Sequence, residues 1–212
     1  MRKNWRNTTA IVLSILLGCI MFYVGTDGFR AFTAESARTY KLLQEKPKFP
    51  NVTLEDSKGR VYSFSELKGK NIMLTFIYTA CSDICPKLEM NLSEVYQQIP
   101  EKYIGEDILF LSISFDPARD NVATLEKYRK AFGSDGETWR MARISDQSEL
   151  DHLLEEFGVI VIPDGEGGFT HNSAFYLVDK NGYLEEVMDY TKIDEAANKV
   201  VEILKNEAGN AK

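Results

Sequence analysis

Unbroken apolar runs of strand length alternate along this chain with segments whose apolar residues recur every three or four positions. An unbroken run indicates a strand buried on both faces, whereas the second spacing places one apolar stripe along a helix. The predicted strands are residues 72–78, 108–115, 139–144 and 174–178. The predicted helices are residues 85–98, 122–132, 147–157 and 193–206. This alternation is typical of an α/β domain.

Two hairpins complete the predicted order. Residues 52–54 and 61–64 are β-prone runs around a turn cluster, and a strand at 183–190 follows the turn at 179–182. The order is then a hairpin followed by β-α-β-α-β-α-β-β-α. It predicts a central, mostly parallel sheet with helices on both faces, to which the late hairpin adds an antiparallel edge. Functional groups in such sheets collect at the carboxyl ends of the strands.

The first residues form a separate apolar segment. Residues 8–25 carry no charge over 18 positions, which is close to the lower limit for a membrane-spanning helix. Three basic residues precede this run, no acidic residue does, and Asp27 follows it. By the positive-inside rule, the sequence predicts a single transmembrane anchor over residues 1–25, with the remaining chain on the extracytoplasmic side of the cell membrane.

Two alternatives to this anchor stay open. A cleaved signal peptide also begins basic and then turns apolar, but no small-x-small cleavage site ends this run. The residues up to Cys19 loosely resemble a lipoprotein cleavage box, although Leu17 is bulky for its position and the apolar run continues beyond Cys19. All three interpretations place the domain outside the cytoplasm, where disulfides form.

The rest of the chain divides into a tether and one domain. Residues 26–46 are mixed and polar, and we expect a tether that contains a loosely packed helix over residues 31–43. The domain is predicted over residues 47–207, a length that can bury a substantial core.

The charge balance excludes one large class of partner. The chain has 25 basic and 32 acidic residues, and from Thr26 onward 22 basic residues face the same 32 acidic ones, a net charge of −10. A nucleic-acid-binding protein needs a basic face to neutralise phosphates, so we expect no nucleic-acid partner. Three cysteines are too few for a disulfide scaffold or for a four-thiolate zinc site.

The candidate chemistry lies just after the first long strand, where Cys81 and Cys85 are separated by three residues. Residues four apart on a helix share a face, and a helix N-terminus lowers thiol pKa values. Pro86 suits the first helical turn. Such a pair can close a disulfide, or its two thiolates can hold a soft metal ion such as copper(I).

The two histidines differ in their surroundings. His152 points away from the apolar side of its predicted helix and is interpreted as a solvated surface residue. His171 follows a glycine-rich segment, residues 164–168, which is interpreted as a mobile loop. A loop beside the strand ends can bring a ligand toward the cysteines, but a lone loop histidine is by itself a weak signal.

Three motifs occur in order and with plausible spacing: FIYTACSDICP at residues 76–86, SFDPARD at 114–120, and His171 ahead of FYLVDKNG at 175–182. Together they resemble the Sco (SCO/SenC) family of copper-binding assembly proteins, over about residues 47–206. The combination is far more specific than two cysteines with this spacing alone.

This resemblance implies a thioredoxin-like fold, a membrane anchor and a copper site made by Cys81, Cys85 and His171. It implies a role in assembling the binuclear copper A centre of cytochrome c oxidase, and hence the oxidase subunit that carries this centre as a partner. The identity of a further partner is left open between another copper chaperone and a thiol reductant. Asp116 matches the family's acidic residue near the site, as a docking group or a supporting neighbour of the ligands.

Two features depart from the family. The family motif often has Gly, Pro or Asp where this chain has Ala80 and Ser82, and the segment before His171 does not match. The main interpretation is a metal-binding assembly factor without turnover. The alternative is a thiol–disulfide oxidoreductase that uses Cys81 and Cys85 as a redox pair to reduce the cysteines of the oxidase copper site. A peroxiredoxin-like peroxidase fits less well, because the cysteines are paired.

Overall fold

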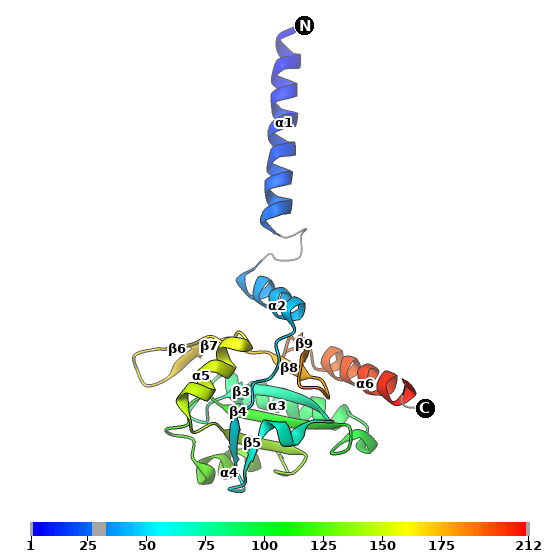
Figure 1. Ribbon diagram of the computed structural model, residues 1–212. Helices are drawn as coiled ribbons and strands as arrows, with labels where there is room; N and C mark the ends of the chain where they lie inside the picture. Colours follow the sequence, from blue (N-terminus) through cyan, green and yellow to red (C-terminus); the bar gives the residue numbers. More distant parts are fainter. Residues whose placement is uncertain (1, 27–32, 211–212) are drawn as a thin grey trace. The chain divides into compact units, whose positions relative to one another are not determined.

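The computed structural model describes residues 2–26 and 33–210, in two compact units, Met1–Glu45 and Lys46–Lys212 (Figure 1). The first unit holds two helices, α1 (Arg2–Gly25) and α2 (Ala34–Glu45). Helix α1 is long and apolar enough to cross a membrane, and its apolar side chains are exposed. Asp27 and the predicted start of the tether helix at residues 31 and 32 lie outside the described residues.

The second unit follows the predicted element order closely. Its central strands are β1 (Thr53–Asp56), β2 (Val61–Ser63), β3 (Asn71–Ile77), β4 (Ile108–Ser114), β5 (Trp139–Arg143), β8 (Phe175–Val178) and β9 (Leu184–Met188). Its α-helices are α3 (Ile84–Gln98), α4 (Val122–Ala131), α5 (Gln147–Glu156) and α6 (Ile193–Asn210). Short 3-10 helices occur at Phe64–Leu67 and Glu101–Tyr103. The predicted ends differ from these by four residues at most, which confirms the α/β assignment.

Fewer neighbouring strands of the central sheet are parallel than predicted. The seven strands lie in the order β2-β1-β5-β4-β3-β8-β9, and only the pairs β3–β4 and β4–β5 are parallel. The late hairpin forms the expected antiparallel edge. The early hairpin joins the other edge, because β1 pairs antiparallel with β5. The sequence pattern could not show this pairing, since strand neighbours far apart in sequence are decided by packing.

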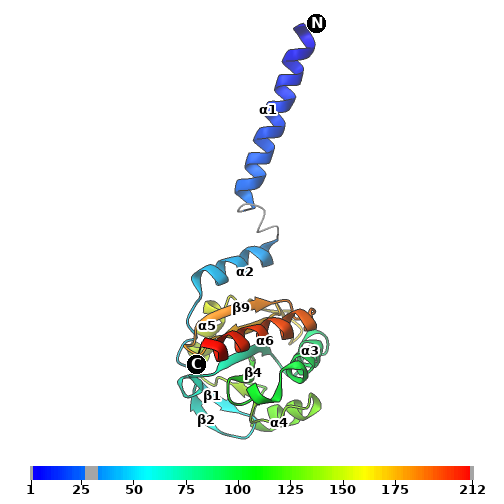
Figure 2. The same ribbon diagram turned by 90° about the vertical axis from the view of Figure 1, so that its right-hand side faces the viewer.

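Helices cover both faces of the sheet, as predicted. Successive residues of a strand point to opposite faces. On β3, the Thr75 hydroxyl donates a hydrogen bond to Glu89 of α3 on one face of the sheet. On the other face, the ring of the next residue, Phe76, contacts the ring of Phe157 at the end of α5. Helix α6 lies beside α3 (Figure 2). Strands β3 and β4 are buried along their whole length, which explains why most of their residues are apolar.

The glycine-rich segment predicted as a loop connects two short strands that the sequence pattern did not predict, and these strands form a second small sheet. Strands β6 (Val161–Pro163) and β7 (Phe169–His171) pair antiparallel. The glycine-rich residues form the turn between them: Gly165 and Gly167 have φ values of 83° and 92°, in the region that favours glycine. Each strand has only three residues, too few to give a recognisable pattern.

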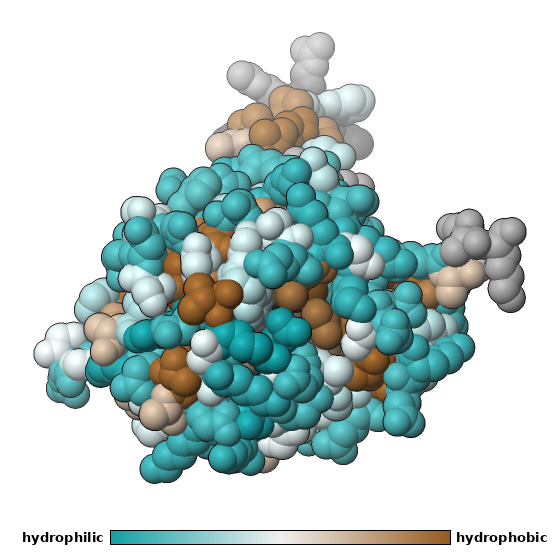
Figure 3. All heavy atoms as spheres, turned by 60° about the horizontal axis from the view of Figure 1, so that its bottom comes forward, coloured by the Kyte–Doolittle hydropathy of each residue, from teal (hydrophilic) through white to brown (hydrophobic). Residues whose placement is uncertain are grey.

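The surface of the second unit agrees with its charge. The face drawn in Figure 3 is largely hydrophilic, and its apolar side chains are scattered in small separate areas. Helix α1 differs, because each large apolar side chain described along it is at least 50% exposed, for example Ile11 at 59%. This face of the second unit is therefore suited to water, and α1 is suited to an apolar surrounding.

Candidate metal centre

The cysteine pair lies where the central strand β3 turns into α3. Cys81 is in the connecting loop, and Cys85 is the second residue of the helix. The Cys85 backbone N–H donates a hydrogen bond to Cys81 Sγ at 3.3 Å. Asp83, just before the helix, makes no side-chain capping bond, so the Cys81 sulfur accepts a bond from one of the free N–H groups of the first turn. Both thiols are free.

This placement makes the two thiols unequal. Partial burial would raise the pKa of the Cys81 thiol, but the N–H groups of Cys85, Asp83 and Ile84 point at this sulfur and hold its pKa below the usual value. Cys85 is fully buried, and burial raises the pKa of its thiol strongly. The Cys81 thiolate is thus the better nucleophile and the first to ionise.

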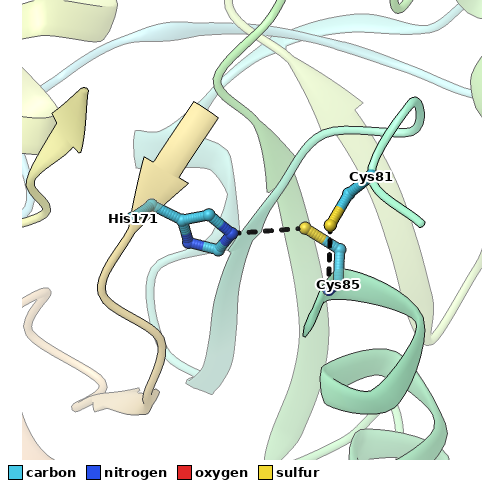
Figure 4. Close-up of side chains that lie close together, drawn as sticks. All are labelled: Cys81, Cys85 and His171. Atoms are coloured by element: carbon cyan, nitrogen blue, oxygen red, sulfur yellow. Dashed lines mark hydrogen bonds between the residues drawn. The ribbon is translucent and has the colours of Figure 1, made fainter. Parts of the chain in front are cut away.

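His171, the last residue of β7, completes the cluster. Its Nε2 lies 3.4 Å from Cys85 Sγ, and its ring points toward the cysteine pair (Figure 4). The two sulfurs and one ring nitrogen all lie within 4.8 Å of one another. The structure therefore brings together the three residues that the resemblance implied as ligands.

A backbone contact sets the tautomer of this imidazole. Nδ1 of His171 lies 3.1 Å from the carbonyl oxygen of Asn172, and a carbonyl only accepts, so Nδ1 carries the hydrogen. Nε2 then presents its lone pair to the cysteines. Burial lowers the pKa of His171 despite this bond, which favours the neutral imidazole that metals bind.

Aromatic rings that the sequence reasoning missed form a wall beside His171. Phe115 lies with its ring centroid 5.0 Å from that of His171, and Tyr78 lies at 6.2 Å. Phe169, two residues before His171, contacts both rings edge-on. Tyr78 and Phe115 each continue an apolar strand in the sequence, so nothing distinguished them from ordinary core residues, and Phe169 is a lone aromatic residue after the glycine-rich turn.

Asp120 holds the start of the Cys81 loop. Its carboxylate is fully buried and accepts hydrogen bonds from the Thr79 N–H at 2.9 Å, from the Thr79 hydroxyl and from the Ser114 hydroxyl. It thereby connects the ends of the neighbouring strands β3 and β4. The sequence motif contained Asp120, but its role needed the position of the adjacent strand.

Asp116 is nearly buried and forms an ion pair with Arg119. Its backbone N–H donates a hydrogen bond to the Ser114 hydroxyl oxygen at 3.0 Å. The contacts described for the Asp116 carboxylate thus connect it to the site through Arg119, which agrees with a supporting position and not with a ligand.

Two further residues that the sequence analysis considered are not part of this cluster. His152 is exposed on α5 and lines an open groove of about 590 Å³ together with Lys48 and Lys68, as expected of a solvated residue. Cys19 is exposed on α1, in the other compact unit.

The donor set has a clear chemical preference. Two thiolates are soft ligands that suit copper(I), and an imidazole makes the site acceptable to copper(II) as well. Two sulfurs and one nitrogen also suit zinc, which usually takes a fourth ligand. Three protein ligands leave one coordination position open.

The comparisons with known proteins agree with this geometry. The family model described as SCO1/SenC matches residues 41–206. The SCO1 protein homolog of Bacillus subtilis is 29% identical over 144 residues, 67% of this chain and 72% of the relative. A putative copper-binding protein of Stutzerimonas stutzeri is 28% identical over 203 residues, 92% of this chain and 95% of the relative.

Among solved structures, yeast Sco1 with copper bound is similar at a TM-score of 0.63 and 25% identity, and the match covers 75% of this chain and 89% of that one. Since the family model spans most of the chain, including all three residues of the cluster, this protein belongs to the SCO1/SenC family.

Proposed function

We propose that this protein binds copper through Cys81 Sγ, Cys85 Sγ and His171 Nε2. The observation that carries the proposal is the convergence of these three atoms within 4.8 Å in a member of the SCO1/SenC family. A relative named as copper-binding and the copper-bound yeast structure support copper over zinc. The soft thiolates supply the affinity for copper(I).

The biological role we propose is assembly of the copper A centre of cytochrome c oxidase, with the subunit that carries this centre as the partner. An open coordination position supports such a role, because an incoming thiolate or imidazole of the partner can bind the ion before the protein's own ligands leave. The partly exposed Cys81 lies where an incoming ligand can reach the ion.

We propose further that residues 1–25 anchor the chain in the cell membrane as a single span and that residues 26–46 form a tether. Residues 47–207 then form the domain that acts on the extracytoplasmic side. The length and exposure of the apolar helix α1 support the anchor. The basic residues before it support the orientation.

The test is a copper titration of the full chain, reduced and held in detergent micelles. A sulfur-to-copper(II) charge-transfer band is expected for the wild type. His171→Ala should weaken copper(II) binding by about tenfold or more, on the order of 1.4 kcal/mol, and shift this band. His152→Ala is the matched control and should change neither. Unchanged copper(II) affinity and spectrum in His171→Ala would overturn the ligand assignment.

A second candidate function is thiol–disulfide exchange, in which this protein reduces the cysteines of the oxidase copper site. The unequal thiols support it: Cys81 has a lowered pKa and is partly exposed, whereas Cys85 is buried beneath it with a raised pKa. This is the asymmetry of an attacking and a resolving thiol. His171→Ala decides between the two functions, since a dithiol reductase does not need the imidazole.

A further inference from the structure

The hairpin that carries His171 stands outside the central sheet. Among the described residues, β6 and β7 form a two-stranded sheet of their own, and the seven-stranded sheet is built from the other strands. Backbone pairing with the central sheet therefore does not fix His171 relative to Cys81 and Cys85. The base of the hairpin is held by the short connection from His171 to β8 and by Asn172, whose side chain bonds to the backbone of Ile160 and Gly158. The turn end is held by side-chain contacts.

Arg119 makes such a contact from the loop after β4. Its Nη1 donates to the carbonyl oxygen of Gly167, in the hairpin turn, at 2.5 Å. Its guanidinium carbon lies 5.5 Å from the ring centroid of Phe169 and 5.9 Å from that of Tyr78. Its Nε donates a hydrogen bond to the Asp116 carboxylate, which holds the opposite edge of the guanidinium group.

Tyr78 makes the second contact with the hairpin. The Phe169 N–H donates to the Tyr78 hydroxyl at 3.3 Å, and the two rings meet edge-on with centroids 5.2 Å apart. Tyr78 directly follows β3 and Arg119 follows β4, so both contacts come from the carboxyl ends of the parallel strands. Arg119 bridges these rings and the turn at the same time.

We propose that Arg119 is a positioning residue for metal binding: it latches the β6–β7 hairpin to the central domain and so holds His171 over the cysteine pair. This inference rests on the proposed function. With the latch closed, the site offers two thiolates and an imidazole, a set that accepts copper(II). With the latch released, the site reduces to the cysteine pair, which retains copper(I). Arg119 therefore controls which oxidation state the site holds.

The chemistry of arginine explains why this residue type is needed. The planar guanidinium presents five N–H donors in a fixed fork and also stacks on aromatic rings. It can bond a carboxylate and a carbonyl on opposite sides while lying against Tyr78 and Phe169. A lysine ammonium at this position can keep the pair with Asp116 but cannot span to Gly167.

The first measurement needs no copper. Hydrogen exchange of the metal-free full chain is followed over residues 164–172, which include the Phe169 amide that reports docking onto Tyr78. Arg119→Gln should speed exchange of this amide about tenfold, and Arg119→Lys should do the same, because lysine cannot span to Gly167. Thermal unfolding of each variant checks that the fold is retained.

Arg129 provides the matched control. Like Arg119, it bonds a carboxylate three residues earlier, on Glu126, and a backbone carbonyl, of Ser134 at 2.7 Å, but it touches no residue of the hairpin among the described contacts. Arg129→Gln should leave exchange over residues 164–172 unchanged. Unchanged exchange in Arg119→Gln would overturn the latch.

The second measurement separates positioning from a general structural role. Arg119→Gln should lose about tenfold in copper(II) affinity and shift the charge-transfer band, while its copper(I) affinity, measured against a competing chelator, changes less than twofold. Equal losses for both ions, or no loss for either, would overturn the proposal. Wild-type protein that bound no copper would overturn the proposed function instead, and the exchange comparison would still decide whether Arg119 holds the hairpin.

Discussion

At the scale of single residues, the two cysteines differ because the chain folds around them differently. Cys81 lies in the loop with N–H groups of the first helical turn directed at its sulfur, whereas Cys85 is enclosed by the core on the helix itself. The N–H groups stabilise a thiolate and burial destabilises one. A difference in reactivity follows that spacing alone does not reveal.

We predict that iodoacetamide modifies Cys81 at least about tenfold faster than Cys85 in the reduced, metal-free chain at pH 7. The reason is the lowered pKa of Cys81 and its partial exposure, against the raised pKa and full burial of Cys85. Mass spectrometry of the peptides measures each rate separately and also resolves Cys19. Equal rates at the two positions would show that the helix N-terminus does not act on Cys81.

Oxidation should join the two thiols reversibly. Their sulfurs lie within 4.8 Å of each other, in a loop-to-helix turn that needs only a small movement to reach bonding distance. Thiol counting before and after treatment with oxidised glutathione is expected to show the loss of two thiols and their recovery on reduction. Two free thiols after oxidation would contradict this prediction, and Cys19→Ser is the control for reaction at the anchor.

At the scale of elements, helix α3 carries the site at its first turn and a buried carboxyl one turn later. Glu89 is fully buried, and its carboxyl accepts hydrogen bonds from Thr75 at 2.8 Å and Ser112 at 2.7 Å. No cation neutralises it among its described contacts. Burial raises the pKa of Glu89 from 4.5 to about 7, against the opposing effect of these two bonds.

This raised pKa predicts a dependence of stability on pH. The folded state binds the Glu89 proton more tightly than the unfolded state, so the contribution of Glu89 to the free energy of unfolding is largest below about pH 4.5 and is lost as the pH rises to about 7. The loss is on the order of 3 kcal/mol, since each pKa unit is worth about 1.4 kcal/mol. Other groups titrate in this range, so a matched pair of variants is needed to isolate the contribution of Glu89.

Glu89→Gln should therefore be more stable than the wild type at pH 8 and close to it at pH 5. Urea unfolding at the two pH values measures the difference. Glu94→Gln replaces an exposed glutamate of the same helix and should follow the wild type at both pH values. A Glu89→Gln variant that parallels the wild type across this range would show that Glu89 is ionised normally in the folded state.

At the scale of the whole molecule, the chain combines two units with opposite surfaces. Helix α1 exposes its apolar side chains and has no buried residue over Asn7–Gly25, whereas Lys46–Lys212 encloses its apolar residues in a core. An apolar helix without a protein core to bury it is stabilised by lipid. The proposed membrane attachment follows from this contrast.

We predict that the mature protein keeps residues 10–24 as a membrane-spanning segment. Mass spectrometry of the native protein, extracted from membranes, should then detect the residues before Thr8. A mature chain that began at a lipid-modified Cys19 would support the lipoprotein alternative, and one that began after Gly25 would support a cleaved signal peptide. Protease added to protoplasts tests on which side of the membrane the domain lies, and an extracytoplasmic domain should be cleaved.

The order of residues was enough to predict the fold class, the cysteine pair and every element of the domain except β6, β7 and the short 3-10 helices, whereas His171 was identified through the family resemblance. Buried strands such as β3 are mostly apolar because both faces are covered, and the amphipathic helices between them carry a visible period. These are local consequences of burial, so they can be recognised in the order of residues. The Cys81–Cys85 spacing is equally local, since the two residues flank one helix start.

How the elements meet could not be predicted from the order of residues. The antiparallel docking of β1 on β5 and the hairpin at His171 depend on contacts between segments far apart in sequence. The same holds for the buried proton site at Glu89 and for the bond from Arg119 to Gly167. A local pattern records whether a residue is buried, but the partner that satisfies a buried or charged group is set by the packing of the whole chain.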